Sequence, residues 1–407
     1  MSFALSSSDD LIYFVIPLSV QKEGEDYCIG NAEIDAFFQF PEQGLRIIEW
    51  LREGRSPGAI KSALSTSGEA SVDVDDFIET LKEIGFIYPE AERGRFRDAA
   101  SASDAGDKRL RFSAPTWLAR AVFSLPMLVV YLSILGLAMH AVVDDPRLRL
   151  NLDAFYLEKH LTLTLVLLLV LYGITASMHE LGHMLAAARY GIASKLGIGN
   201  RLWSLVAEAD LTGILTLPRS KRYLPLLGGM IVDLLSIALV TLSIQWLLRH
   251  GHDGFIVQLL QALILQIVIS ISWQFNLFLK TDVYYVVCNY YGHPDLDQAA
   301  RVYLRDKLHT ASLGFFGEKS PSIERRHLGV LRAFALLWLF GRVSAIAFLF
   351  LILIPTLARY FGRARDAFSD PATASAAAYD AAAFAVISAV LFLLGMYMWL
   401  RRKKSAE

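Results

Sequence analysis

Six long apolar runs follow one another along the chain after residue 120. They cover about 121–142, 161–188, 223–248, 255–279, 330–357 and 381–400. Each run reaches the roughly 20 residues that a helix needs to cross the hydrocarbon core of a bilayer. The pattern therefore predicts a polytopic membrane protein that is mainly α-helical, with about six transmembrane helices.

The first 90 residues have a different pattern, with enough polar positions for a separate water-soluble domain. Short apolar runs predict two strands, and apolar residues at helical spacing predict three short helices. These elements are expected at 12–20, 27–29, 42–52, 56–67 and 73–84. We therefore expect a small α/β domain over 1–90, a linker rich in Ala, Ser, Asp and Arg over 91–116, and the membrane domain over 117–404.

Composition and charge agree with this division. Hydrophobic residues make up 54% of the chain and charged residues 19%, and the mean hydropathy is +0.41, more apolar than a water-soluble protein of this size needs. The net charge of −1 gives no sign of nucleic-acid binding. The two cysteines, Cys28 and Cys288, lie far apart, so we expect neither a disulfide scaffold nor a cysteine-based zinc site.

Lysine and arginine are about three times as frequent on one side of the predicted spans, which places both termini in the cytosol.

The second apolar run contains three titratable residues, His179, Glu180 and His183. Such side chains are costly in hydrocarbon, at about 3 kcal/mol each, so they need a partner or a function. Histidines four residues apart lie one turn apart on the same helix face, where both can bind one Zn²⁺ ion. Glu180 lies about 100° around the helix from His179 and can act as general base and then general acid. This His-Glu-x-x-His pattern is typical of zinc metalloproteases.

A hydrolytic zinc site takes three protein ligands and keeps one open position. Two carboxylates could complete this one. Asp282 follows the fourth apolar run at a depth compatible with the two histidines, in a helix that we expect to continue past it. Asp233 lies in the third run and could instead accept a hydrogen bond from a ligand imidazole or bind substrate. Position along the chain does not separate these alternatives.

The order of these motifs resembles the site-two-protease family of membrane-embedded zinc metallopeptidases. The fourth run resembles the Asn-Pro-x-x-Lys/Arg-x-Asp-Gly-Tyr-Tyr signature of its bacterial peptide zinc metalloprotease branch, matched here by Asn276, Lys280, Asp282, Tyr284 and Tyr285. Leu277 replaces the proline and Val283 the glycine, which removes two helix breakers and argues against the local unwinding that exposes the aspartate in the family.

This resemblance implies one Zn²⁺ per chain with Asp282 as the third ligand. It implies substrate-binding roles for Asn276, Asp233 and Lys280, and a location in a bacterial inner (cytoplasmic) membrane. The segment 201–217 resembles the family's β-hairpin, which can add a substrate strand, although an ordinary connector is the alternative.

The N-terminal domain resembles the winged-helix-like peptide-recognition elements related to the pyrroloquinoline-quinone biosynthesis chaperone. The residues that carry the resemblance lie in 45–54 and 74–87. It implies that a leader peptide adds a strand to a sheet edge and packs on the third helix. That helix carries Asp75, Asp76, Glu79 and Glu83, an acidic surface that argues against contact with nucleic-acid phosphates.

Together these features predict a membrane-embedded zinc endopeptidase that cleaves near the cytosolic face. Its expected substrate is a ribosomally synthesised, modified precursor peptide, from which it removes the leader. Two alternatives are regulated intramembrane proteolysis of a transmembrane substrate, and a non-catalytic peptide-binding or export partner with a structural metal. The expected partners are the precursor peptide and the lipid bilayer, without nucleic acid; the sequence leaves the oligomeric state open.

Overall fold

The chain forms two compact units. The computed structural model describes residues 11–34, 36–66, 73–95, 110–155, 161–201, 204–292, 295–311, 328–355, 358–359, 362, 365–366 and 374–406. The N-terminal unit comprises 1–111 with 210–222, and the helical unit comprises 112–209 with 223–407. The segment 210–222, called the connector below, thus groups with the N-terminal unit, whereas the sequence placed it in the membrane domain. The predicted linker lies partly outside the described residues, at 96–109.

The N-terminal unit combines short antiparallel strands with three helices. Its elements are β1 (Tyr13–Val15), β2 (Ser19–Glu23), β3 (Asp26–Asn31), β4 (Ala36–Phe40), α1 (Glu42–Arg52), α2 (Pro57–Thr66), α3 (Val74–Glu83) and β5 (Ile87–Pro89). β1 pairs with β5, and β2, β3 and β4 form a second sheet in that order. The three predicted helices are confirmed. The single strand predicted over 12–20 is wrong: two strands lie there in different sheets, because Pro17 between them cannot donate a ladder hydrogen bond.

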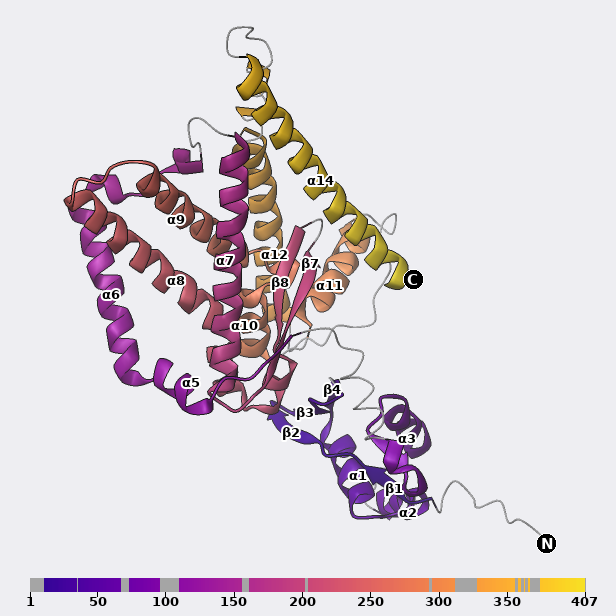
Figure 1. Cartoon of the computed structure of the whole chain (residues 1–407). Helices are drawn as coiled ribbons and strands as arrows, with labels where there is room; N and C mark the ends of the chain where they lie inside the picture. The colour runs from indigo at the N-terminus through magenta and orange to yellow at the C-terminus, as the bar shows by residue number, and fades with distance from the viewer. Residues whose placement is uncertain are drawn as a thin grey trace. The chain divides into compact units, whose positions relative to one another are not determined.

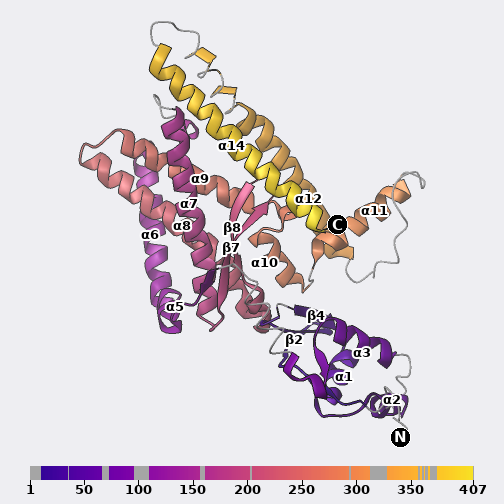
Figure 2. The same ribbon diagram turned by 45° about the vertical axis from the view of Figure 1, so that its right-hand side comes forward.

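The helical unit contains the long apolar helices (Figure 1). Its helices are α5 (Thr116–Val122), α6 (Leu125–Asp144), α7 (Leu161–Ala188), α8 (Arg219–Arg249, whose first residues belong to the connector), α9 (Phe255–Gln274), α10 (Asp282–Tyr291), α11 (Leu296–Ala311), α12 (Leu328–Phe348) and α14 (Ala374–Ala406). A third sheet has the order β6 (Leu110–Phe112), β7 (Ser194–Arg201), β8 (Ser204–Asp210); Leu110, Arg111 and Asp210 at its ends are counted with the N-terminal unit. In two views β7 and β8 lie alongside α7 (Figures 1 and 2).

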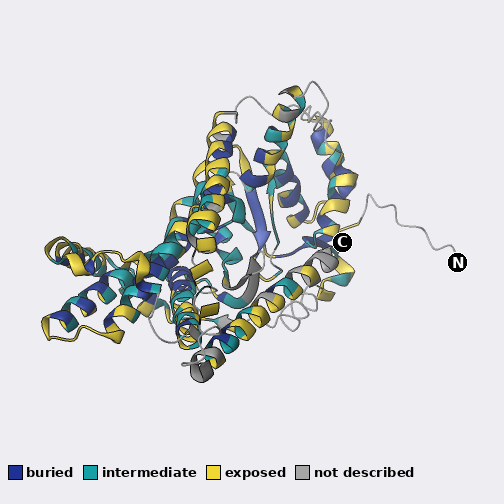
Figure 3. Cartoon of the chain, turned by 90° about the horizontal axis from the view of Figure 1, so that it is seen from above, coloured by how far each residue is buried: buried dark blue, intermediate teal, exposed yellow. Residues whose placement is uncertain are grey.

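Six helices in the described part of the chain are long and apolar enough to cross a membrane, as predicted. They lie in α6, α7, α8, α9, α12 and α14. Most of their residues are not buried within the protein, and Figure 3 shows exposed positions along these helices. Many of the exposed side chains are large and apolar, such as Leu132, Leu339 and Leu393. This surface is compatible with an integral membrane protein, in which lipid covers it.

The prediction that the fourth apolar helix continues past Asp282 is wrong. α9 ends at Gln274, a 3₁₀ turn covers Leu277–Leu279, and α10 begins at Asp282. Lys280 takes a left-handed backbone conformation, with φ of 52°, that normally favours glycine. The turn is held by side chains: Lys280 Nζ lies 2.8 Å from Asp295 Oδ2. The chain therefore unwinds here without the family's proline and glycine.

Candidate metal centre

Three side chains from two helices converge on one point. α7 supplies His179 and His183, and the first residue of α10 supplies Asp282. Their donor atoms are close together: Nε2 of His183 lies 3.1 Å from Nε2 of His179, and Asp282 Oδ2 lies 3.0 Å and 3.2 Å from the Nε2 atoms of His179 and His183. Both histidines are buried. Among the described residues, this is the one group of His, Cys, Asp and Glu side chains that could hold a metal ion.

The other nitrogen of each imidazole has its own acceptor. His179 Nδ1 lies 2.8 Å from Asp233 Oδ2, and His183 Nδ1 lies 2.7 Å from the carbonyl oxygen of Pro225. These acceptors favour the proton on Nδ1 in both rings, so both Nε2 atoms direct a lone pair toward Asp282. Two lone pairs and a carboxylate oxygen this close repel one another unless a cation lies among them. A bound metal ion satisfies all three at once.

The distances fit a tetrahedral zinc site. Bonds of 2.0–2.1 Å from Zn²⁺ to nitrogen place two tetrahedral donors about 3.3 Å apart, close to the observed separations. The donor set of two imidazoles and one carboxylate is also that of hydrolytic zinc sites. The residues present therefore fit a zinc ion with three protein ligands.

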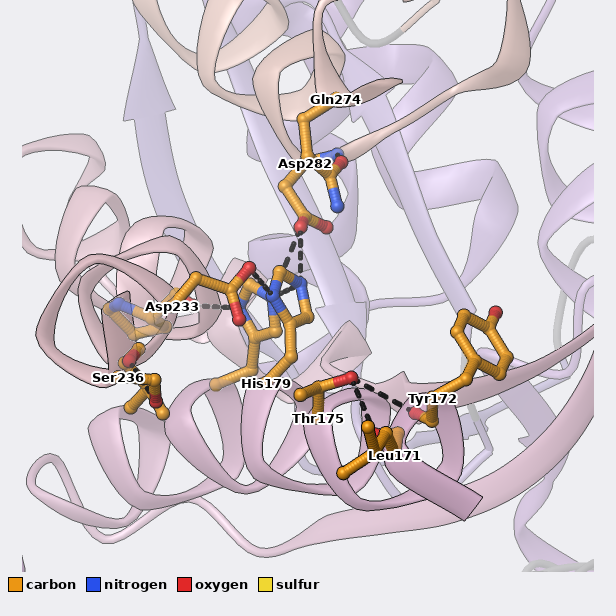
Figure 4. Close-up of polar contacts among 11 residues, drawn as sticks. Leu171, Tyr172, Thr175, His179, Asp233, Ser236, Gln274 and Asp282 are labelled. Atoms are coloured by element: carbon orange, nitrogen blue, oxygen red, sulfur yellow. Dashed lines mark hydrogen bonds and ion pairs between the residues drawn. The ribbon is translucent and has the colours of Figure 1, made fainter. Parts of the chain in front are cut away.

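Geometry gives the two candidate aspartates different places. Figure 4 shows Asp282 and Asp233 approaching His179 from different sides. Asp282 faces the Nε2 atoms, where a ligand is needed, and its backbone N–H donates to Gln274 Oε1 at 3.2 Å. Asp233, buried in α8, faces Nδ1 of His179, where it orients the ring.

Glu180 lies on α7 next to the histidines and contacts a strand. Its Oε2 accepts a hydrogen bond of 2.8 Å from the backbone N–H of Ala209 in β8. This carboxylate interacts electrostatically with both histidines and with Asp282. β8 is an edge strand of its sheet in the described part of the chain. The carboxylate expected to act as base is thus fixed beside an edge strand.

Asn276 and Lys280 form their hydrogen bonds and ion pair with residues other than the three candidate ligands. The buried Asn276 donates to the carbonyl of Trp273 at 3.2 Å and accepts from Ser344 Oγ of α12 at 3.2 Å. Lys280 forms its ion pair with Asp295. Both residues stabilise the turn before Asp282 in this structure, and their contacts with substrate stay predictions.

A glycine that the sequence analysis did not connect with the metal ligands lies against them. A Cβ atom added to Gly229 of α8 would lie 2.6 Å from Nε2 of His179 and closer still to Nε2 of His183. One residue before it, Gly228 packs on Gly182 of α7 so tightly that a Cβ on Gly182 would lie 2.5 Å from the Gly228 carbonyl oxygen. Two consecutive glycines, Gly228 and Gly229, are a sequence signal for such a close approach, because glycine has no Cβ atom.

Comparison of the chain with protein-family models, with curated proteins and with solved structures gives no match.

Replacing Asp233 with asparagine should weaken zinc binding without abolishing it. Loss of a carboxylate that orients a ligand imidazole typically costs about 10–100-fold in metal affinity. We expect that loss in a competition titration of the purified protein with a zinc chelator. Ser236→Ala is the matched control, because Ser236 lies nearby on α8 and donates only to the carbonyl of Val232. A loss as complete as that in Asp282→Ala would instead make Asp233 a ligand.

Proposed function

We propose that this protein is a membrane-embedded zinc endopeptidase. The observation that carries the proposal is the convergence of His179, His183 and Asp282 at distances that fit zinc, with Glu180 on the same helix. Three protein ligands leave one of four tetrahedral positions open, which is the arrangement of catalytic rather than structural zinc sites. The resemblance to site-two proteases supports the same assignment and a location in a bacterial inner membrane with both termini in the cytosol.

Glu180 is the residue proposed to transfer the proton. When bound, Zn²⁺ supplies Lewis acidity, which polarises the scissile carbonyl and makes water acidic enough to lose a proton near neutral pH. Glu180 takes that proton as general base and delivers it to the leaving amine as general acid. The hydrogen bond from Ala209 N–H fixes one carboxylate oxygen and leaves the other for this task. Asp233 and the Pro225 carbonyl keep the two imidazoles in the tautomer that binds metal.

The open edge of β8 can hold the substrate. An extended peptide that pairs with this edge gains main-chain hydrogen bonds without any sequence requirement. Since Ala209 of the same strand contacts Glu180, a peptide on this edge would lie close to the general base. A hairpin does form, but over 194–210 and not over 201–217, since Thr212–Thr216 is a 3₁₀ turn. Substrate binding by the hairpin is part of the proposal.

The N-terminal unit is proposed to capture the leader of a ribosomally made, modified precursor peptide. β4 is an edge strand in the described sheet, and its Phe38 is 42% exposed. Phe40, the last residue of β4, packs edge-on against Phe77 of α3, with ring centroids 5.7 Å apart, so the end of this strand contacts the third helix. A leader could add a strand to β4 and pack on α3, as in the winged-helix-like elements that this domain resembles. Capture would raise the effective concentration of the cleavage site.

The metal content of the detergent-purified protein tests the proposal first. We expect about one zinc per chain in the wild type by elemental mass spectrometry, and loss of zinc in both His179→Ala and Asp282→Ala, because each removes one of three ligands. Retention of zinc in Asp282→Ala would move the third ligand elsewhere. A freshly purified wild type without zinc would contradict the protease assignment.

Cleavage then separates catalysis from a structural role of the metal. The zinc-loaded protein is incubated with a pool of random-sequence peptides, and new termini are identified by mass spectrometry. We expect cleavage by the wild type and none by His179→Ala. Stable zinc without any cleavage would favour the non-catalytic peptide-binding or export partner.

A further inference from the structure

The β2–β3 hairpin of the N-terminal unit has buried side chains on both of its faces. Val20 and Ile29 point into the core formed with the helices. Alternate residues point the other way, where a small α/β domain normally meets water. Yet Cys28 is only 6% exposed and the Glu23 side chain only 7% exposed. Something covers this second face.

The connector provides that cover, through contacts within the N-terminal unit. Gln21 Nε2 donates to the carbonyl of Thr216 at 2.8 Å. Arg222 forms an ion pair with Glu23, and the same guanidinium donates to the carbonyls of Leu217 at 2.8 Å and Leu215 at 3.0 Å. Arg222 is buried, so these partners offset the cost of removing its charge from water. We call the Glu23–Arg222 ion pair, together with the hydrogen bond of Gln21, the latch.

The residues that flank the connector on each side contact residues of the candidate metal centre. The residue before it, Ala209, donates its N–H to Glu180. Three residues after Arg222, Pro225 offers its carbonyl to His183 Nδ1. The conformation of the connector therefore bears on two backbone groups that orient the general base and one metal ligand.

We propose that Glu23 and Arg222 are positioning residues, through which the N-terminal domain holds the connector so that Ala209 and Pro225 keep Glu180 and His183 in their working orientations. This inference rests on the proposed peptidase function. It assigns the N-terminal domain a second task besides substrate capture. The latch should act on turnover of any peptide, including one without a leader, because it acts through the catalytic groups and not through substrate contacts.

Cys28 reports on the latch without any need for activity. Burial, and then the neighbouring Glu23 carboxylate, raise the pKa of the Cys28 thiol to about 11. In a Cys288→Ala background it is the sole thiol, and N-ethylmaleimide should modify it slowly. Arg222→Gln should speed this modification at least tenfold by uncovering the thiol. The direct electrostatic effect has the opposite sign, since the Arg222 charge lowers the pKa of Cys28 and its loss would slow the reaction.

The same full-length variants are assayed with a short, leader-free peptide taken from the random pool. For Arg222→Gln we expect kcat to fall about tenfold with KM changed less than twofold, and zinc release to a chelator to accelerate several-fold. Glu23→Gln should behave alike, and the double variant should be no worse than either single one. Arg222→Lys, which keeps the charge, should recover most of kcat. Asp26→Asn is the matched control, because it removes an exposed carboxylate from the same hairpin.

Each other result would overturn the inference. Unchanged thiol modification means that no latch closes over Cys28. Faster modification with unchanged kcat and zinc release means that the connector does not position the site, and a rise in KM alone would make the contact part of substrate capture. If the wild type binds zinc but cleaves no peptide, the proposed function fails. Thiol modification and zinc release still test the latch in that case.

Discussion

Glu180→Gln should slow peptide cleavage by several orders of magnitude and leave the zinc content at about one per chain. The glutamine has the same shape and can still accept the Ala209 N–H bond, so the local structure is kept. It cannot take a proton from water at neutral pH. Loss of a general acid–base typically costs about 10²–10⁴-fold in rate. We expect a fall of that size in kcat on the random-pool peptide, measured beside zinc content by elemental mass spectrometry.

The neighbouring carboxylate Glu208 provides the control. It lies on β8 next to Ala209 but is exposed, so Glu208→Gln should leave both kcat and zinc unchanged. Residual activity of Glu180→Gln within tenfold of the wild type would remove Glu180 from the chemistry. Loss of zinc in this variant would make it a metal ligand or a structural support instead.

The six apolar helices could be predicted because hydropathy is a local property of the sequence. A run of about 20 apolar residues meets the length requirement of the bilayer whatever its neighbours are. The break before Asp282 could not be predicted in the same way. The sequence there lacks proline and glycine, and the left-handed Lys280 is held by Asp295, which lies beyond the next helix. Tertiary context, and not the local sequence, decides the break.

The candidate metal centre could be predicted only in part from local sequence. The spacing of His179 and His183 fixes their common face within one helix. The roles of Asp233 and Asp282 depend instead on which imidazole nitrogen each one meets, and helix packing alone decides that. The latch is a still longer-range feature, since Glu23 and Arg222 are 199 positions apart in the chain. Neither residue belongs to a motif that would have drawn attention to it.

Gly229→Ala should remove zinc from the site. The added methyl group would lie 2.6 Å from Nε2 of His179 and closer to Nε2 of His183, far inside van der Waals contact with the two nitrogen atoms proposed to bind the metal. The rings cannot simply rotate away, because Asp233 and the Pro225 carbonyl hold their other nitrogens. We expect the zinc content to fall below about a tenth of the wild-type value, with loss of cleavage, since misplaced ligands no longer share one tetrahedral site.

A change in helix propensity would not explain a loss of zinc in Gly229→Ala. Alanine is a better helix former than glycine by about 1 kcal/mol, so the exchange should stabilise α8 locally if the methyl group met open space. Gly173→Ala in α7 is the matched control, because a Cβ there has nothing within 4 Å; it should keep its zinc. Wild-type zinc content in Gly229→Ala would show that the α7–α8 contact is looser than described. The two histidines and Asp282 would then need a different arrangement around the ion.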